Sequence, residues 1–270
     1  MAMTKSNGMD AEDLALRREP LEAAVAASLK AEEDILKGIG GMDEAEAAPR
    51  KLNLADEMLN LASFHLALDG VSRSAGGSRD EAALNNARKV LNRGIGYLEE
   101  VVSSGVDVAF SDYGDRLRAI ASVTPAERYF LVRKIGLSID LVANTFADSS
   151  RWKWTFVELR GRFVAVAKNL IDLDKVVAYS DPRSPHYEPT VFHLRLVKKL
   201  LTLSAEKYRE KYELSSKSTD DFGRSLTFLS ALRRLCMLTD DNEKAEATRK
   251  KIDIWNSKLQ ADEKKRAGAG

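Results

Sequence analysis

Basic and aromatic side chains alternate in one short stretch of the chain, which reads RWKWTFVELRGR and contains Glu158 as its single acidic residue. Cationic groups bind phosphates, and aromatic rings stack on bases or lie at a lipid interface. The pattern could therefore serve a nucleic acid, a membrane surface or a protein partner. The candidate partner-binding residues in this stretch are Arg151, Lys153, Trp154, Arg160 and Arg162.

The same stretch also fits an ordinary amphipathic helix. At helical spacing, Trp152, Phe156 and Phe163 share one face and would pack in a core, while the arginines would face solvent. Trp154 distinguishes the two interpretations because it lies off the apolar stripe. We expect it to be exposed if the stretch binds a partner.

A second candidate stretch, AEKYREKYELSSKSTDD, places Tyr208 and Tyr212 on one helical face with lysines and an arginine nearby. Tyrosine with flanking cations is typical of a recognition edge for a peptide. The alternative is the charged end of one helix followed by the start of the next. In that case Asp220 and Asp221 need no catalytic role, because acidic residues complement the dipole at a helix N-terminus.

Motifs for catalysis are missing from the sequence. There is no G-x-x-x-x-G-K-[ST] phosphate loop and no G-x-S-x-G nucleophile elbow. None of His65, His186 and His193 follows a glutamate by three residues, as a di-iron helical bundle would require. We expect surface or capping roles for His186 and His193 and a partly buried structural role for His65. The sequence thus predicts no catalytic residue, no metal site and no cofactor.

Composition narrows the class of protein further. The 42 basic residues balance 41 acidic residues, so global charge predicts no nucleic-acid binder. Cys236 is the only cysteine, which favours a reducing compartment, and its leucine neighbours predict a buried thiol. No apolar run of about 20 residues and no export signal occur, so we expect a cytoplasmic protein.

A helix expected from Arg151 to Tyr179 would position the first candidate stretch. Its apolar residues recur at intervals of three and four and form a face broad enough to be enclosed by other helices. The helix before it begins with the chain's best start signal, a capping box in which Thr124 and Glu127 flank Pro125. A short link should make these two helices an antiparallel hairpin.

Helical spacing recurs along nearly the whole chain, with hardly any strand signal. Further helices are expected at about 20–37, 52–68, 80–103, 112–122 and 190–214, then from Ser218, and from a second capping box at Asp240 and Glu243. Gly94 and Gly96 would mark a close helix crossing. The predicted fold class is all-α, with about eight or nine helices stacked as antiparallel hairpins or as an irregular bundle.

Composition also suggests a domain plan. Residues 1–19 are expected to be disordered, 20–179 to form an N-terminal helical domain, and 190–261 to form C-terminal hairpins packed on it. The proline-rich segment 180–189 would be a stiff connector, because proline stops helix propagation. Residues 262–270 would be a frayed tail.

The segment from Phe222 to Leu259 resembles a tetratricopeptide-repeat hairpin. Leu229 and Leu232 stand on its first helix, and Ala245 stands where the family packs a small residue against the preceding helix. Arg233 replaces a usually small residue and Arg249 a usually aromatic one, and no 34-residue period recurs. The resemblance implies a scaffold that binds a peptide or protein along its first helices.

These observations predict a non-enzymatic helical scaffold or adaptor that binds a protein partner, or a second copy of itself, through a helical surface. Binding of nucleic acid or membrane through the stretch from Arg151 to Arg162 is a less favoured alternative. The remaining alternative is an enzyme or ligand binder whose site is a cavity between helices, with dispersed residues that form no motif.

Overall fold

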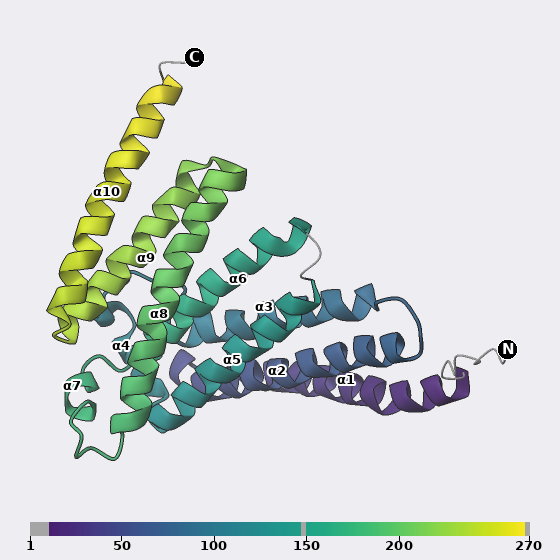
Figure 1. Cartoon of the computed structure of the whole chain (residues 1–270). Helices are drawn as coiled ribbons and strands as arrows, with labels where there is room; N and C mark the ends of the chain where they lie inside the picture. The colour runs from purple at the N-terminus through teal and green to yellow at the C-terminus, as the bar shows by residue number, and fades with distance from the viewer. Residues whose placement is uncertain (1–10, 147–149, 268–270) are drawn as a thin grey trace. The chain divides into compact units, whose positions relative to one another are not determined.

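A computed structural model describes residues 11–146 and 150–267 of the chain. These residues form ten α-helices, one 3-10 turn and one π-helical turn, and no strand occurs among them (Figure 1). The predicted all-α fold class is therefore confirmed. No helix in the described ranges combines the length and the apolar character needed to cross a membrane.

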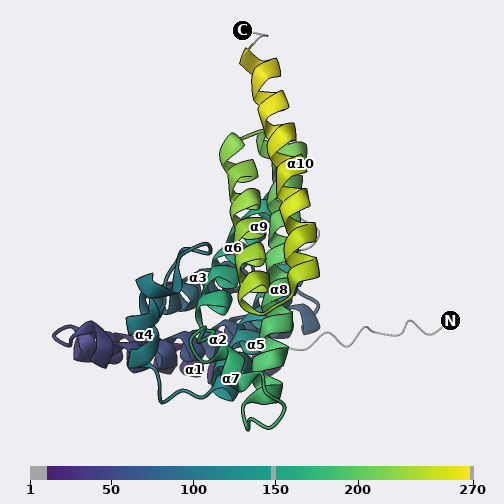
Figure 2. The same ribbon diagram turned by 90° about the vertical axis from the view of Figure 1, so that its left-hand side faces the viewer.

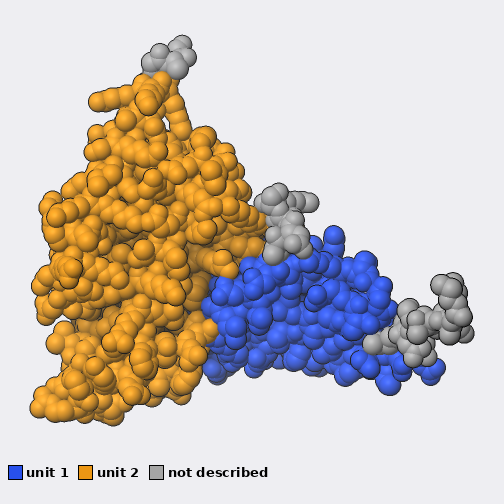
Figure 3. Space-filling view, viewed as in Figure 1, with its two compact units in different colours: residues 1–101, 134–148 blue, residues 102–133, 149–270 orange. Residues whose placement is uncertain are grey.

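The chain divides into two compact units, shown in different colours in Figure 3. Unit 1 comprises the described residues of Met1–Val101 and Lys134–Asp148, and unit 2 those of Val102–Arg133 and Ser149–Gly270. The division falls inside helix α5, Pro125–Thr145, so each unit receives one part of this helix. The proline-rich segment from Ser180 to Pro189 lies within unit 2.

Unit 1 is built on three long helices, α1 (Ala11–Ile39), α2 (Glu44–Ser74) and α3 (Glu81–Val101). Helix α2 packs against both α1 and α3. Gly94 of α3 sits against α2, where a Cβ atom would come within 3.0 Å of the Met58 Cβ atom. The predicted close crossing is thus confirmed at Gly94.

Helix α1 begins nine residues earlier than the sequence predicts. Residues 11–19 are helical, so the predicted disorder of 1–19 is wrong for them, while residues 1–10 lie outside the described ranges. Glu12 and Asp13 in the first turn complement the helix dipole. Arg18 also anchors the segment, because its Nη1 donates to Ser72 Oγ at 2.7 Å and lies 3.1 Å from Asp80 Oδ2.

Helix α2 likewise begins earlier than the expected start near residue 52, since it starts at Glu44. Its N-cap is Asp43, whose Oδ1 accepts a hydrogen bond of 2.7 Å from the Glu46 amide. This cap satisfies an amide that a helix start leaves without a partner. The acidic segment after Met42 is therefore the first turn of α2.

Unit 2 surrounds helix α6, Ser150–Asn169. Every residue from Phe163 to Ile171 is buried, which confirms that other elements enclose this part of the chain. The predicted continuation of the helix to Tyr179 is wrong: the helix ends at Asn169, and only a short helix, α7 (Val176–Tyr179), follows. Asn169 Nδ2 donates instead to the carbonyls of Ser103 and Gly105, each at 3.0 Å.

Three further helices complete unit 2: α8 (Tyr187–Lys211), α9 (Thr219–Leu238) and α10 (Asn242–Ala267). Helix α9 packs against both α8 and α10 and lies between them in Figure 1, and Figure 2 shows the same three helices from another side. A π-helical turn, Tyr212–Ser216, ends α8, and the expected helix at 112–122 is the shorter α4, Gly114–Ala119, after a 3-10 turn at Phe110–Asp112.

The capping predictions in unit 2 are confirmed at two of three helix starts. Glu127 accepts from the Thr124 amide at 2.7 Å, and Ser218 Oγ accepts from the Asp220 amide at 3.3 Å. The third prediction is wrong by one residue: Asp240 has a positive φ of 52°, and the Asp241 carboxylate accepts from the Lys244 amide.

The expected frayed tail is also partly helical, since α10 continues to Ala267. Asp262 helps to hold it, because its Oδ2 accepts from the hydroxyl group of Tyr212 at 3.0 Å. Residues 268–270 lie outside the described ranges.

Candidate functional site

The two stretches singled out in the sequence meet on neighbouring helices of unit 2. Helices α6 and α8 run antiparallel, since Ala167 contacts His193 near one end and Glu158 contacts Lys211 near the other. Glu158 accepts from Tyr208 Oη at 2.9 Å and from Lys211 Nζ and Arg224 Nη1, each at 2.5 Å. The single acid of the basic stretch is thus the centre of an ion-pair cluster.

Tyr208 and Tyr212 do not form an exposed recognition edge, and that expectation is wrong. Each retains only 3% of its accessible surface. Tyr208 stacks on Phe228 with ring centroids 5.4 Å apart, and Tyr212 meets Phe222 edge to face at 4.9 Å. Helix α9 carries both phenylalanines, so it covers the face on which the tyrosines lie.

The cations of the basic stretch are largely engaged within unit 2. Lys153 lies 2.6 Å from Glu210 and 4.7 Å from the ring centroid of Trp154. Trp154 is half-buried, as are Arg160 and Arg162. The side chain of Arg151 lies outside the described residues.

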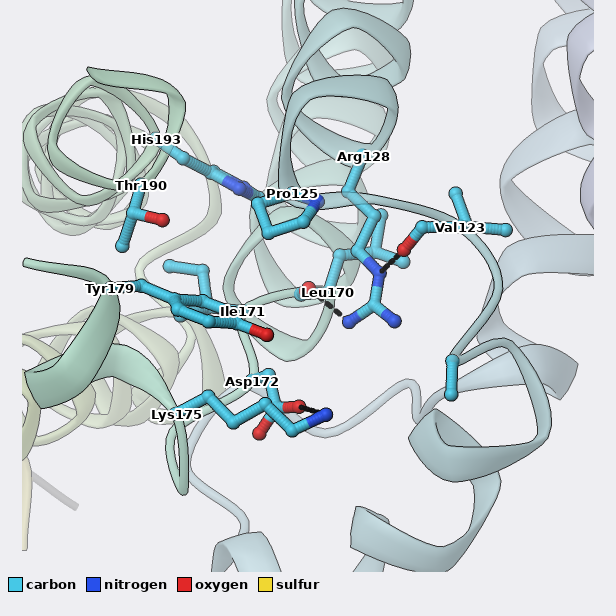
Figure 4. Close-up of a pocket in the computed structure, with 11 residues that line it drawn as sticks. Val123, Pro125, Arg128, Leu170, Ile171, Asp172, Lys175, Tyr179, Thr190 and His193 are labelled. Carbon is cyan, nitrogen blue, oxygen red and sulfur yellow. Dashed lines mark hydrogen bonds and ion pairs between the residues drawn. The ribbon is translucent and has the colours of Figure 1, made fainter. Parts of the chain in front are cut away.

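A polar cavity that no sequence motif indicated lies elsewhere in unit 2, among the start of α5, the end of α6, α7 and the start of α8 (Figure 4). Its volume is about 50 Å³, room for a few water molecules or a small ion. The residues that line it are Ala121, Val123, Pro125, Arg128, Leu170, Ile171, Asp172, Lys175, Tyr179, Thr190 and His193.

Arg128 is the buried cation of this cavity, with 6% of its surface exposed. Its guanidinium group donates to three backbone carbonyls: Nη2 to Ile120 at 2.9 Å, Nε to Val123 at 3.0 Å and Nη1 to Leu170 at 3.4 Å. Burial lowers the pKa of Arg128, because desolvation disfavours the charged form. Among the described residues, no carboxylate lies within ion-pair distance of it.

Helix α8 contributes Thr190 and His193 to the cavity. The Oγ1 atom of Thr190 is buried and has no hydrogen-bond partner among the described residues. His193 retains 4% exposure, so its expected surface or capping role is wrong. Burial lowers its pKa to about 4, which keeps the ring neutral at pH 7. Because a carbonyl oxygen can only accept, the proton of the neutral ring lies on Nε2, which donates to the Ala167 carbonyl at 2.9 Å.

The more accessible side of the cavity carries Asp172, Lys175 and Tyr179. Lys175 Nζ lies 3.5 Å from Asp172 Oδ2, and their side chains are 53% and 21% exposed. Figure 4 shows the Arg128 guanidinium and the Tyr179 hydroxyl directed toward this pair. With His193 neutral, two cations and one anion give the lining a net charge of +1.

The other histidines take structural positions. His65 of unit 1 is buried, consistent with its expected structural role, and His186 is half-buried and packs against Tyr179 with ring centroids 4.6 Å apart. No group of three or more His, Cys, Asp and Glu side chains in the described ranges could hold a metal ion.

An exposed apolar face lies on the side of α8 that is directed away from the core residues Val197 and Leu201. Phe192 and Leu203 are 44% and 47% exposed, and Leu196 and Leu200 between them are half-buried.

Tyr129 of α5 extends this face, since its ring lies 6.3 Å from that of Phe192. We call these residues, together with Phe130, the α8 face: Tyr129, Phe130, Phe192, Leu196, Leu200 and Leu203.

Comparison with known proteins places most of the chain in one family. The model of the TP0443 family matches residues 12–263. No curated protein matches the chain.

Proposed function

The chain belongs to the TP0443 family, and we propose that it is a non-enzymatic scaffold or adaptor that binds a protein partner through the α8 face. The observation that carries this proposal is the exposure of a continuous apolar stripe on a helix whose other side is fully packed. Phe192 and Leu203 are separated by 11 residues, or about three helical turns. The stripe is therefore long enough to receive a partner helix or an extended peptide.

The composition of the α8 face supports a protein partner. Phe130 is 61% exposed, and its ring lies 6.2 Å from that of Tyr129. Arg133 lies over Tyr129, 5.6 Å from the ring centroid. Contiguous exposed apolar surface marks interaction sites, and aromatic residues with arginine are enriched in the parts of interfaces that contribute most affinity.

We extend the proposal to a tetratricopeptide-like use of the hairpin formed by α9 and α10. Ala245 is buried, as expected for a small residue packed against the preceding helix, which supports this extension. Arg249 departs from the repeat pattern, because it is exposed and pairs with Glu246 and Asp253. We also propose a cytoplasmic location, which the unpaired, buried Cys236 supports.

Nucleic acid or a membrane surface is the less favoured partner. Binding through the basic stretch requires cations that can contact phosphate, and Lys153 is paired with Glu210 while Glu158 holds Lys211 and Arg224. Lys153 is thus held by a carboxylate, and the single acid of the stretch is occupied by cations of α8 and α9. A partner that binds apolar surface fits the exposed side chains better.

The test is affinity capture from the native cell with the purified protein as bait, followed by titration of the captured protein. We expect Phe130→Ser and Phe192→Ser to weaken that protein's binding at least tenfold, because each removes an exposed aromatic ring from the interface. Ile254→Ser is the matched control, since Ile254 is a 68% exposed apolar residue on α10, outside the α8 face.

Binding that is equal for the wild-type and both α8-face variants would contradict the proposal. Capture of nucleic acid or lipid, with a steep dependence on salt, would instead favour the basic stretch. Light scattering of the purified protein checks whether the partner is a second copy of the chain.

A further inference from the structure

We propose that the cavity at Arg128 binds a small oxyanion, namely a carboxylate or a phosphate-type group, between the N-terminal end of α5 and helix α8. This site is separate from the α8 face and does not depend on the proposed scaffold function. The juxtaposition of a buried guanidinium with a buried, unpaired hydroxyl carries the inference.

The charge of Arg128 is the first reason to expect an anion. A buried cation is strongly destabilising unless a counter-charge or a full set of acceptors compensates it. Three carbonyls orient the guanidinium and accept hydrogen bonds, and the charge of the nearby Asp172 carboxylate favours its charged form without forming an ion pair with it. A bound oxyanion would supply the direct ion-pair partner that Asp172, which pairs with Lys175, does not supply.

The donors around the cavity are the second reason. Of the five N–H groups on a guanidinium, three are used for the carbonyls of Ile120, Val123 and Leu170, so two remain. Thr190 Oγ1, with 6% of the residue exposed, lines the same cavity and has no partner among the described residues. Carboxylates and phosphates accept several such hydrogen bonds at once.

The net charge of the groups that line the cavity favours a negatively charged ligand. Asp172 would repel an anion, but its carboxylate pairs with Lys175, so the net charge of the lining stays at +1. His193 adds no charge, since burial keeps its imidazole neutral. The cavity volume of about 50 Å³ limits the bound part to a small group, such as a free anion or the terminal group of a larger molecule.

The test measures the thermal unfolding midpoint of the whole protein while sodium acetate or sodium phosphate replaces sodium chloride at constant ionic strength. We expect a saturable rise of at least about 2 °C at ten times the dissociation constant, because ligand binding stabilises the native state. A response to acetate alone identifies a carboxylate site, and a response to phosphate alone identifies a phosphate site. A response to both establishes the shared oxyanion chemistry.

Variants assign the effect to the cavity. Thr190→Val keeps the side-chain shape and removes the hydroxyl, so the dissociation constant should rise about tenfold. Thr202→Val is the matched control on the same helix, because the Thr202 hydroxyl donates to the Lys198 carbonyl and does not line the cavity. Arg128→Lys, which keeps a charge but loses the planar fork, should also weaken binding.

Two outcomes would overturn the inference. One is the absence of any saturable rise with either anion, which would mean that the cavity holds only water. The other is an equal rise in the wild-type and Thr190→Val proteins, which would place the anion elsewhere. Circular dichroism of each variant confirms that it is folded, and Thr190→Val keeps the test valid if Arg128→Lys fails to fold.

Discussion

Tyr208 of α8 closes over Gly161 of α6 so tightly that a Cβ atom at position 161 would lie 2.5 Å from the tyrosine hydroxyl oxygen and 2.8 Å from Cε2. The absence of a side chain at Gly161 is what allows Tyr208 to reach Glu158. This close approach connects the two helices that carry the candidate stretches identified in the sequence.

Gly161→Ala should therefore destabilise the protein, although alanine is the better helix former. The added methyl group would displace the Tyr208 ring, and we expect a loss of about 1–3 kcal/mol in the free energy of unfolding. Denaturant titration measures this loss. Gly223→Ala is the control: nothing lies within 4 Å of the Cβ that it would add to α9, so it should stabilise by about 0.5–1 kcal/mol. Equal effects of the two substitutions would contradict the packing described for Gly161.

His193 should make the protein sensitive to acid. Its pKa is lowered to about 4 by burial, while an unperturbed histidine titrates near 6.5. Between these values the unfolded chain binds more protons, so stability falls as the pH drops from about 6.5 to about 4. The contribution of one such group is about 3 kcal/mol over that range.

The measurement is the free energy of unfolding of the wild-type and His193→Gln proteins at several pH values between 4 and 7. The wild-type should lose more stability than the variant on acidification. His65→Gln is a useful comparison, because burial also lowers the pKa of His65, which belongs to unit 1. Parallel pH curves for the wild-type and His193→Gln would show that His193 is not buried as a neutral ring.

Lys168 should make the stability of the protein depend on pH in the alkaline range. It is buried on α6, donates to the Val108 carbonyl at 3.2 Å, and burial lowers its pKa to about 8. The unfolded chain holds this proton up to about pH 10.5, so stability should rise with pH above 8. The slope from one group is at most about 1.4 kcal/mol per pH unit.

Unfolding measurements between pH 7.5 and about 9.5 check this prediction, with Lys168→Met as the variant. The wild-type curve should rise relative to that of Lys168→Met. The range stops there because burial raises the pKa of Tyr113, whose contribution has the opposite sign at higher pH. A wild-type curve that is flat relative to the variant would contradict the prediction.

Local signals in the sequence predicted much of the fold. Capping at Thr124 and Ser218 followed from side chains that satisfy amides within three residues, and burial of Cys236 followed from its leucine neighbours. The end of α6 could not be predicted in this way. Its apolar pattern continues past Asn169, where the helix ends and the Asn169 side chain donates to carbonyls of Ser103 and Gly105, about 65 residues earlier in the chain.

The candidate sites likewise depend on contacts between distant parts of the chain, which local sequence patterns do not reveal. Periodicity located Tyr208 and Tyr212 on one face but could not show that α9 covers it. Arg128 did carry a signal, because it lies four residues before Val132 on the buried stripe of α5, where a charged residue is unusual. Its relation to Thr190 depends on how the chain folds back over some 60 residues, and neither residue belongs to a motif.

The division into two units also determines which optical probes report on which part of the molecule. Trp152, Trp154 and Trp255 all belong to unit 2, as does Cys236, which is buried with a thiol pKa raised by desolvation. Tryptophan fluorescence and thiol labelling would follow the opening of unit 2 alone, whereas far-ultraviolet circular dichroism would follow the helices of both. If the two units unfold together, the two kinds of unfolding curve should coincide. A difference between their midpoints would show that the units unfold separately, and no introduced label is needed to measure it.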